Sequence, residues 1–121
     1  MDNTKEFINM CEKADKYINS NWEDGDYIHC PDLNKTIIYN FVYTNVVKMG
    51  LNVIKLYRQD QLQRIVKEGN TTDLELLNRL AIMAKGKDYL IYKYDWSMEQ
   101  LWLAFVMKEK FNKTWSRGDW V

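Results

Sequence analysis

The segment that begins at Trp96 carries more coincident helix signals than any other part of this chain. Ser97 and Gln100 have the spacing of a capping box, in which each side chain satisfies a backbone amide that the first helical turn leaves without a partner. Trp96 and Leu101 occupy the two positions of a hydrophobic staple, and Glu99 lies where the positive end of the helix dipole favours an acid. We therefore predict a helix that begins immediately after Ser97.

This predicted helix is apolar on all sides. Residues 101–107 read Leu-Trp-Leu-Ala-Phe-Val-Met, whereas a helix at the surface of a small domain shows only one apolar stripe. Either it is the central helix of the fold or one side of it also contacts another chain. Aromatic residues are enriched at protein contacts. The interaction candidates are the large aromatic residues in this helix and beyond it, namely Trp102, Phe105, Trp115 and Trp120.

The length and composition are those of one globular domain. A chain of 121 residues, 46% hydrophobic and 28% charged, can bury a core without disulfides or a structural metal. One proline and five glycines leave no room for a flexible linker, so we expect short connections between elements. We predict a single domain over residues 1–121, mostly α, forming a compact small helical domain with one or two short strands. An α+β fold is the alternative.

Capping residues and apolar periodicity predict three further helices. The first is capped by Asn3 and runs for about 16 residues by the usual end signals. The second runs from Arg58 to Glu68. The third follows a capping box of Thr72 and Glu75 and ends at Gly86. The apolar positions are Phe7, Cys11, Ala14 and Ile18 in the first helix, and Leu76, Leu77, Leu80, Ala81 and Ala84 in the third.

Four other segments are harder to assign. Residues 22–27 contain Gly and Asp and indicate a turn. Residues 36–49 fit both a helix and an alternating strand, and we predict helix. Residues 51–57 are typical of a short strand or an extended connector, and the tyrosine-rich residues 87–95 of an edge strand or a loop.

Charge and cysteine usage narrow the compartment and the partners. Seventeen Lys and Arg balance seventeen Asp and Glu, so no overall field draws the protein to nucleic acid or to an anionic membrane. The polar start and the absence of a long apolar run predict a cytoplasmic, unprocessed protein with no membrane partner. Cys11 lies on an apolar stripe, and we expect Cys11 and Cys30 to be reduced.

Signatures of enzymatic chemistry are sparse in this sequence. A hydrolase of the Ser-His-Asp or Cys-His kind would have to use His29, because it is the one histidine of the chain. An extended segment would direct the side chain of Cys30 away from it. The usual motifs for nucleotides, dinucleotides and zinc are absent. We predict no catalytic residues and no cofactor.

Two weaker sites remain as alternatives. The first is the segment of residues 24–32, whose oxygen and imidazole donors could bind a divalent ion and would make the chain a metal-dependent enzyme. The spacing of these donors does not match a calcium loop, and a solvated acidic loop is favoured. The second could follow a phosphate backbone beside stacking rings, although the neutral net charge favours an ordinary solvated face. The metal candidates are Asp24, Asp26, His29 and Asp32, and the nucleic-acid candidates are Lys108, Lys110, Lys113 and Arg117.

The chain also repeats two short patterns, with residues 57–62 matching 96–101 and residues 22–27 matching 115–120. Convergent helix-end chemistry accounts for both without duplication or a shared ligand motif. A family resemblance is carried by Arg58-Gln59-Asp60-Gln61-Leu62-Gln63 and, more strongly, by Ser97-Met98-Glu99-Gln100-Leu101-Trp102-Leu103-Ala104-Phe105-Val106-Met107-Lys108-Glu109-Lys110 running on to Trp115 and Trp120.

In these segments, about a third of the chain, the sequence resembles small, uncharacterised phage and prophage proteins of bacteria. The resemblance implies phage ancestry rather than a particular activity. The number of aromatic residues favours a non-enzymatic protein that acts by protein contact, with a protein partner or as a homo-oligomer. The resemblance implies that this protein is a phage-type accessory protein. Nucleic-acid binding and metal-dependent catalysis are the alternatives.

Overall fold

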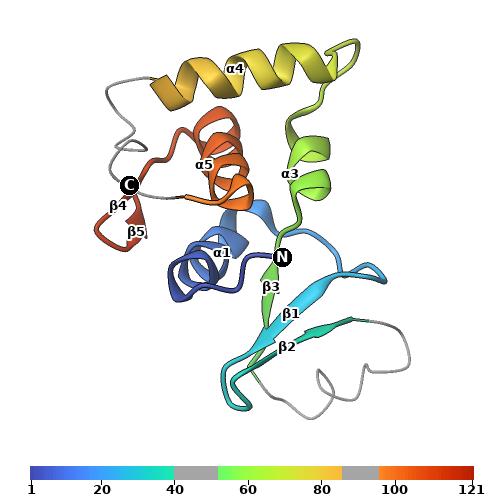
Figure 1. Ribbon diagram of the computed structural model, residues 1–121, viewed down its shortest axis with the longest axis vertical. Coiled ribbons are helices and arrows are strands. Elements are labelled where there is room, and N and C mark those ends of the chain that lie inside the picture. Colours follow the sequence, from blue (N-terminus) through green and yellow to red (C-terminus); the bar gives the residue numbers. More distant parts are fainter. Residues whose placement is uncertain (40–51, 86–95) are drawn as a thin grey trace.

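The computed structural model describes residues 1–39, 52–85 and 96–121 (Figure 1). Helices contain most of the described residues that are in regular structure, which confirms a mostly α domain with short strands. The short strands outnumber the one or two that we expected. In chain order the elements are α1 (Lys5–Ile18), β1 (Tyr27–Cys30), β2 (Lys35–Ile38), β3 (Ile54–Leu56), α3 (Gln59–Val66), α4 (Asp73–Lys85), α5 (Met98–Phe111), β4 (Trp115–Ser116) and β5 (Asp119–Trp120).

The start of α5 has the predicted capping box. The Gln100 amide donates to Ser97 Oγ over 3.2 Å, and the Ser97 amide donates to Gln100 Oε1 over 2.9 Å. The Ser97 hydroxyl also donates to Asp2 near the N-terminus. At the other end, Asn112 adopts a left-handed conformation with φ 53°, and its amide caps the last turn. The predicted start of this helix is therefore confirmed.

The body of α5 is the centre of the core. Every residue from 102 to 107 is buried, so no side of the helix in this region faces solvent. The elements α1, α3 and α4 pack around it, as Figure 1 shows, and β5 adds Trp120. Of the two explanations for an all-round apolar helix, the structure supports the central helix.

The first helix begins one residue later than predicted. Thr4, not Asn3, is the N-cap of α1, because Thr4 Oγ1 accepts a hydrogen bond from the Phe7 amide over 3.3 Å. The Thr4 amide is in turn bonded to the Asp2 side chain. The helix ends at Asn19, whose φ of 46° is left-handed.

The segment from residue 36 to 38 corrects our prediction of a helix over 36–49. It belongs to β2, which pairs antiparallel with β1 so that Tyr27 lies opposite Ile38. Pairing with a partner strand outweighed the helical spacing of the apolar residues. Residues 40–49 lie outside the described part of the chain.

The strand β1 is the centre of a sheet with the order β2-β1-β3, in which both pairings are antiparallel. For residues 51–57 we left a short strand and an extended connector open, and the structure has the short strand β3 there. The predicted end of a helix at Gly86 and the predicted strand or loop over 87–95 fall on residues that are not described.

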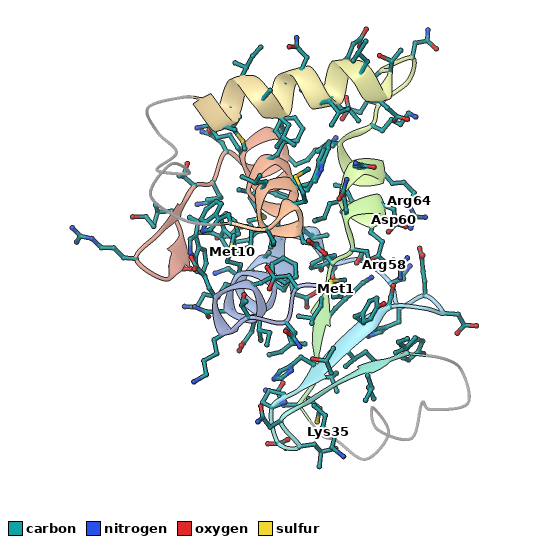
Figure 2. All side chains as sticks on the ribbon, in the orientation of Figure 1. Met1, Met10, Lys35, Arg58, Asp60 and Arg64 are labelled. Atoms are coloured by element: carbon teal, nitrogen blue, oxygen red, sulfur yellow. The ribbon has the colours of Figure 1, made fainter. Side chains whose placement is uncertain are left out.

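The N-terminal ends of α3 and α4 are capped by hydrogen bonds like those of α5. The Arg58 amide donates to Gln61 Oε1 over 3.0 Å at the start of α3, which matches the bond between Ser97 and Gln100 in α5. The Glu75 amide donates to Thr72 Oγ1 over 3.2 Å at the start of α4. On the outer side of α3, Arg58 donates to Asp60, and this bond lowers the pKa of Asp60 (Figure 2).

The helix α4 lies at one edge of the molecule, across the ends of α3 and α5 (Figure 1). Its buried residues Leu76 and Leu80 pack into the core. Its other side carries side chains that project away from the rest of the protein (Figure 2). Among the helices that the structure describes, none has the length and apolar character needed to cross a lipid bilayer.

The first prediction concerns the role of Phe105, in the buried part of α5, in the core. We expect Phe105→Ala to lower the free energy of unfolding by about 3–5 kcal/mol, because it leaves a cavity in a packed site. The control Met98→Ala removes an exposed side chain of the same helix and should cost less than about 1 kcal/mol. Urea titrations followed by circular dichroism measure both, and similar losses in the two variants would contradict a core role for Phe105.

Candidate functional site

The most unusual polar group of the structure is the carboxylate of Asp26, which is completely buried just before β1. Its Oδ2 accepts from the Glu23 amide over 2.7 Å and lies 3.2 Å from Lys55 Nζ. Its Oδ1 accepts from the Gln61 side-chain amide and lies 3.5 Å from Arg58 Nη1. Both oxygens are thus fully used by this chain's own groups.

Lys55 is almost as deeply buried, with 6% of its surface exposed. Besides Asp26, its ammonium donates to Ser20 Oγ over 2.8 Å and to the Asn21 carbonyl over 2.9 Å. The rings of Trp22 and Tyr57 lie 5.7 and 5.4 Å from it, within the range of cation–π attraction. These contacts join the segment after α1 to β3.

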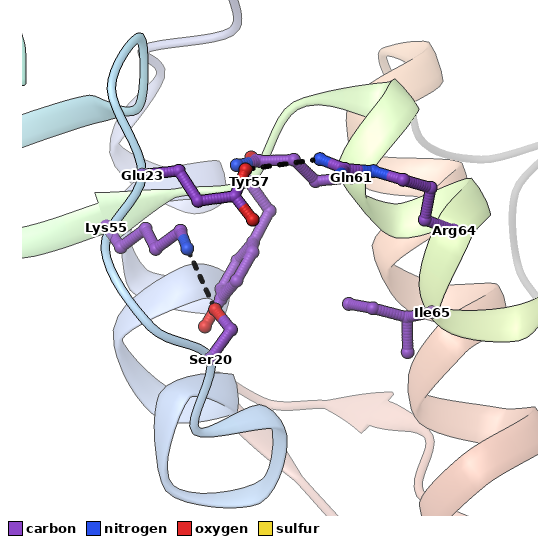
Figure 3. Close-up of a pocket in the computed structure, with 7 residues that line it drawn as sticks. All are labelled: Ser20, Glu23, Lys55, Tyr57, Gln61, Arg64 and Ile65. Carbon is purple, nitrogen blue, oxygen red and sulfur yellow. Dashed lines mark hydrogen bonds and ion pairs between the residues drawn. The ribbon is translucent and has the colours of Figure 1, made fainter.

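A small pocket of about 200 Å³ opens beside this cluster (Figure 3). Arg64 reaches across it to Glu23, with 3.4 Å between the charged atoms. Tyr57 donates to Asp15 over 3.0 Å, and burial raises the pKa of its hydroxyl, which stays protonated at neutral pH. The pocket is smaller than the usual 300–1,000 Å³ or so of small-molecule sites. Its charged residues are paired, Arg64 with Glu23 and Lys55 with Asp26.

A larger groove of about 560 Å³ lies between α1 and the sheet. His29 lines this groove, and its Nδ1 atom lies 3.2 Å from Thr36 Oγ1. The neighbouring Cys30 is buried on the opposite side of β1, as expected for an extended segment. His29 therefore has no thiol partner there, and the remaining lining is mostly amide and apolar.

The four metal candidates are not brought together. Asp24 and Asp32 are exposed, and Asp26 is buried among cations. Asp26 and His29 are separated by three residues of extended chain, about 10 Å along the strand direction. No group of three or more potential ligands is found within residues 1–39, 52–85 and 96–121. The hypothesis of a metal-dependent enzyme at residues 24–32 therefore loses its geometric basis.

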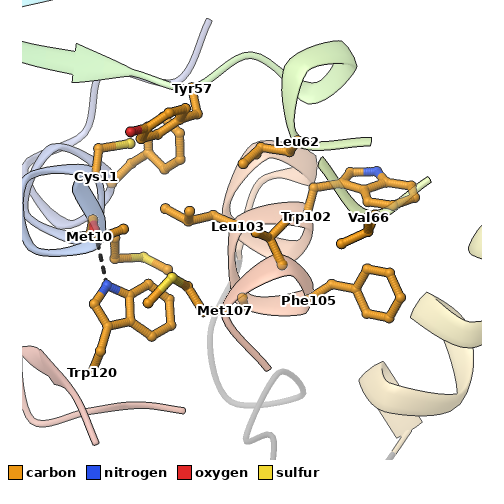
Figure 4. Packing of buried hydrophobic residues seen from close by; sticks show 14 of the residues in the cluster. Met10, Cys11, Tyr57, Leu62, Val66, Trp102, Leu103, Phe105, Met107 and Trp120 are labelled. Carbon is orange, nitrogen blue, oxygen red and sulfur yellow. Dashed lines mark hydrogen bonds between the residues drawn. The ribbon is translucent and has the colours of Figure 1, made fainter. Parts of the chain in front are cut away.

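Three of the four interaction candidates prove to be core residues. Trp102, Phe105 and Trp120 are between 1 and 3% exposed, and Figure 4 shows Trp102 and Phe105 extending from α5 into the core and Trp120 near Met107. Trp120 also donates its indole N–H to the Met10 carbonyl over 3.1 Å. Trp115 is half-buried against Trp120, with ring centroids 4.9 Å apart. Because Trp102, Phe105 and Trp120 are buried in the core, a surface that binds a partner must use other residues.

The nucleic-acid candidates are scattered over the end of α5 and the hairpin after it. Lys110 donates to Glu68, and this bond lowers the pKa of Glu68. Lys113 lies over the Tyr17 ring at 5.7 Å, while Lys108 and Arg117 are exposed. Acidic side chains and half-buried aromatic rings lie among these four basic residues, so they do not form a continuous basic surface.

The surface that our sequence prediction missed is on α4. Leu77 and Ala81, two of the apolar positions from which we predicted this helix, are exposed. Together with three other exposed residues they form one side of the helix, directed away from the core. We call this side the α4 outer face, and it consists of Leu74, Leu77, Asn78, Ala81 and Ile82.

Comparison of the chain with protein-family models, with curated proteins and with solved structures gave no match.

The buried carboxylate yields a second prediction. We expect Asp26→Asn to lower the free energy of unfolding by about 3–5 kcal/mol, since it leaves the Lys55 charge buried without its anion. Asp60→Asn is the matched control, because it removes an exposed carboxylate from the same cluster and should cost less than about 1 kcal/mol. Equal losses in urea unfolding would show that burial of the charge pair does not matter.

The thiols yield a third prediction. Cys11 and Cys30 are buried and are not joined in a disulfide in the structure, and burial raises the pKa of the Cys11 thiol. Because the thiolate is the reactive form, we expect neither thiol of the native protein to react at an appreciable rate with an aromatic disulfide reagent. Both should react at once in denaturant, and rapid reaction of one thiol in the native protein would contradict the packing described above.

Proposed function

We propose that this chain is a non-enzymatic protein-interaction module, a phage- or prophage-type accessory protein, and that it binds its partner through the α4 outer face. The observation that carries this proposal is the exposure of apolar residues there. Leu74 is 76% exposed and Ile82 is 63% exposed, and Leu77 at 46% lies between them on the same side. Contiguous apolar patches of this kind are typical of protein contacts.

The inner side of the same helix supports the proposal. Leu76 and Leu80 already attach α4 to the core, so the fold does not require the apolar residues on the outer face. Exposing leucine and isoleucine to water is unfavourable by about 1.5–3 kcal/mol each relative to full burial. A partner that covers the outer face would recover part of that free energy.

The polar sites offer less support for an enzyme. The charged groups around Asp26 pair with each other, and the groove at His29 contains no neighbouring thiol. The phage part of the proposal depends on the resemblance of residues 58–63 and 97–110 to small phage and prophage proteins.

Affinity capture tests the proposal. A tagged chain would be recovered from bacterial cells that also express the untagged chain, and the co-purified proteins would be quantified by mass spectrometry. We expect Leu74→Glu/Ile82→Glu to lose at least one protein that the wild type retains. Both residues are exposed, so the variant should stay folded.

The matched control is Leu33→Glu, which introduces the same charge at an exposed leucine outside α4. It should retain the partner. If wild type, α4 variant and control recover the same proteins in the same amounts, the α4 outer face is not a contact surface and the proposed function fails.

A further inference from the structure

We propose that the partner of the α4 outer face is a second copy of this chain, with the two α4 helices packed antiparallel across a twofold axis at Asn78. This inference rests on the proposed function, because it names the occupant of the same surface.

The apolar pattern is symmetric about Asn78. Leu74 precedes it by four residues and Ile82 follows it by four. In an antiparallel pair centred on Asn78, Leu74 of each copy therefore lies opposite Ile82 of the other, so the most exposed apolar side chains of α4 cover each other twice. Leu77 then lies beside Ala81 of the other copy, and the small alanine lets the helices approach closely.

The amide of Asn78 suits the centre of such a pair. A carboxamide both donates and accepts hydrogen bonds, so two copies of Asn78 can satisfy each other across the twofold axis. A single Asn in an apolar helix contact is a known way to fix register and the number of chains, because other registers leave the amide buried without a partner. One polar residue within this otherwise apolar face thus favours one alignment.

The charges permit this pairing. The chain has a formal net charge of zero, so two copies do not repel each other at long range. Glu75 and Arg79 share one flank of α4, and a twofold axis places that flank beside its own copy. Glu75 of one chain then lies within about 3 Å, along the helix axis, of Arg79 of the other.

The groups on this flank are available for such a contact. The Arg79 guanidinium binds Glu109 over 2.6 Å and has further N–H donors for a second carboxylate. Glu75 has no ion pair within the described residues. The antiparallel arrangement also aligns the two helix dipoles favourably.

The expected complex is weak and reversible. The 13 residues of α4 span about 20 Å, and contact between two single helices buries less than the roughly 1,200 Å² of a stable standard interface. We therefore expect a dissociation constant on the order of 10 μM to 1 mM rather than a permanent dimer.

Sedimentation equilibrium over a range of concentrations tests the partner. The wild-type chain should change from monomer to dimer as its concentration rises, and Leu33→Glu should behave in the same way. Ile82→Glu should weaken dimerisation at least about tenfold, because it buries a charge opposite Leu74 twice per dimer. A wild-type chain that stays monomeric throughout, or an Ile82→Glu variant that dimerises like the control, would overturn the inference.

Spin labels test the antiparallel alignment. Labels on Arg79→Cys, which leaves Asn78 in place, should be offset by only about 3 Å along the helix axis in the dimer, and labels on Asp73→Cys by about 15 Å, because one and five residues of helix separate these positions from the twofold axis. The native cysteines are buried, so the spin label should not attach to them in the folded protein. Equal short separations at both positions would indicate parallel helices and would overturn the proposed pairing.

The two proposals can fail separately. If the purified chain is monomeric while Leu74→Glu/Ile82→Glu selectively loses a different protein in affinity capture, the occupant is not a second copy, and the inference is overturned while the proposed function stands. If the α4 variant changes neither self-association nor capture, both are overturned.

Discussion

The burial of α5 on every side is the constraint on which the rest of the structure depends. Because residues 102–107 are apolar around the whole helix, each neighbouring element has to contribute one apolar side to cover it. The helices α1, α3 and α4 do so with their inner sides, and the hairpin after α5 adds Trp120. Once α5 is covered, apolar residues left outside have no role in the core. For this reason we propose the α4 outer face as a contact surface.

The buried charges around Asp26 hold a second part of the fold together. They connect the turn before β1 with β3 and the start of α3, which places the sheet against the helices. A buried carboxylate is tolerated only when it is paired and hydrogen-bonded, and here two cations and two amides surround it. The cluster therefore positions elements and leaves no charged group free for chemistry. Of the acidic residues in the segment of residues 24–32, Asp26 is part of the framework, whereas Asp24 and Asp32 are exposed.

Signals that lie close together in the sequence predicted the structure best. The capping bonds at Ser97 and Thr72 join residues only three positions apart, and both helices start where expected. Longer-range features were missed for physical reasons. Strand β2 exists because it pairs with β1, and Asp26 is buried because Gln61, 35 residues away, donates to it. Trp102 and Phe105 were assigned to a contact surface because an apolar residue in a sequence does not show whether its own chain covers it.

The central claim concerns the side of α4 that faces away from α5. A dilution series of two-dimensional ¹H–¹⁵N NMR spectra tests it most directly, because each backbone amide reports on its own surroundings. The account predicts that amide signals of residues 73–85 shift as the protein concentration rises, while those of the buried body of α5 and of the sheet stay in place. Spectra that do not change with concentration, or shifts confined to another surface such as β2, would contradict it.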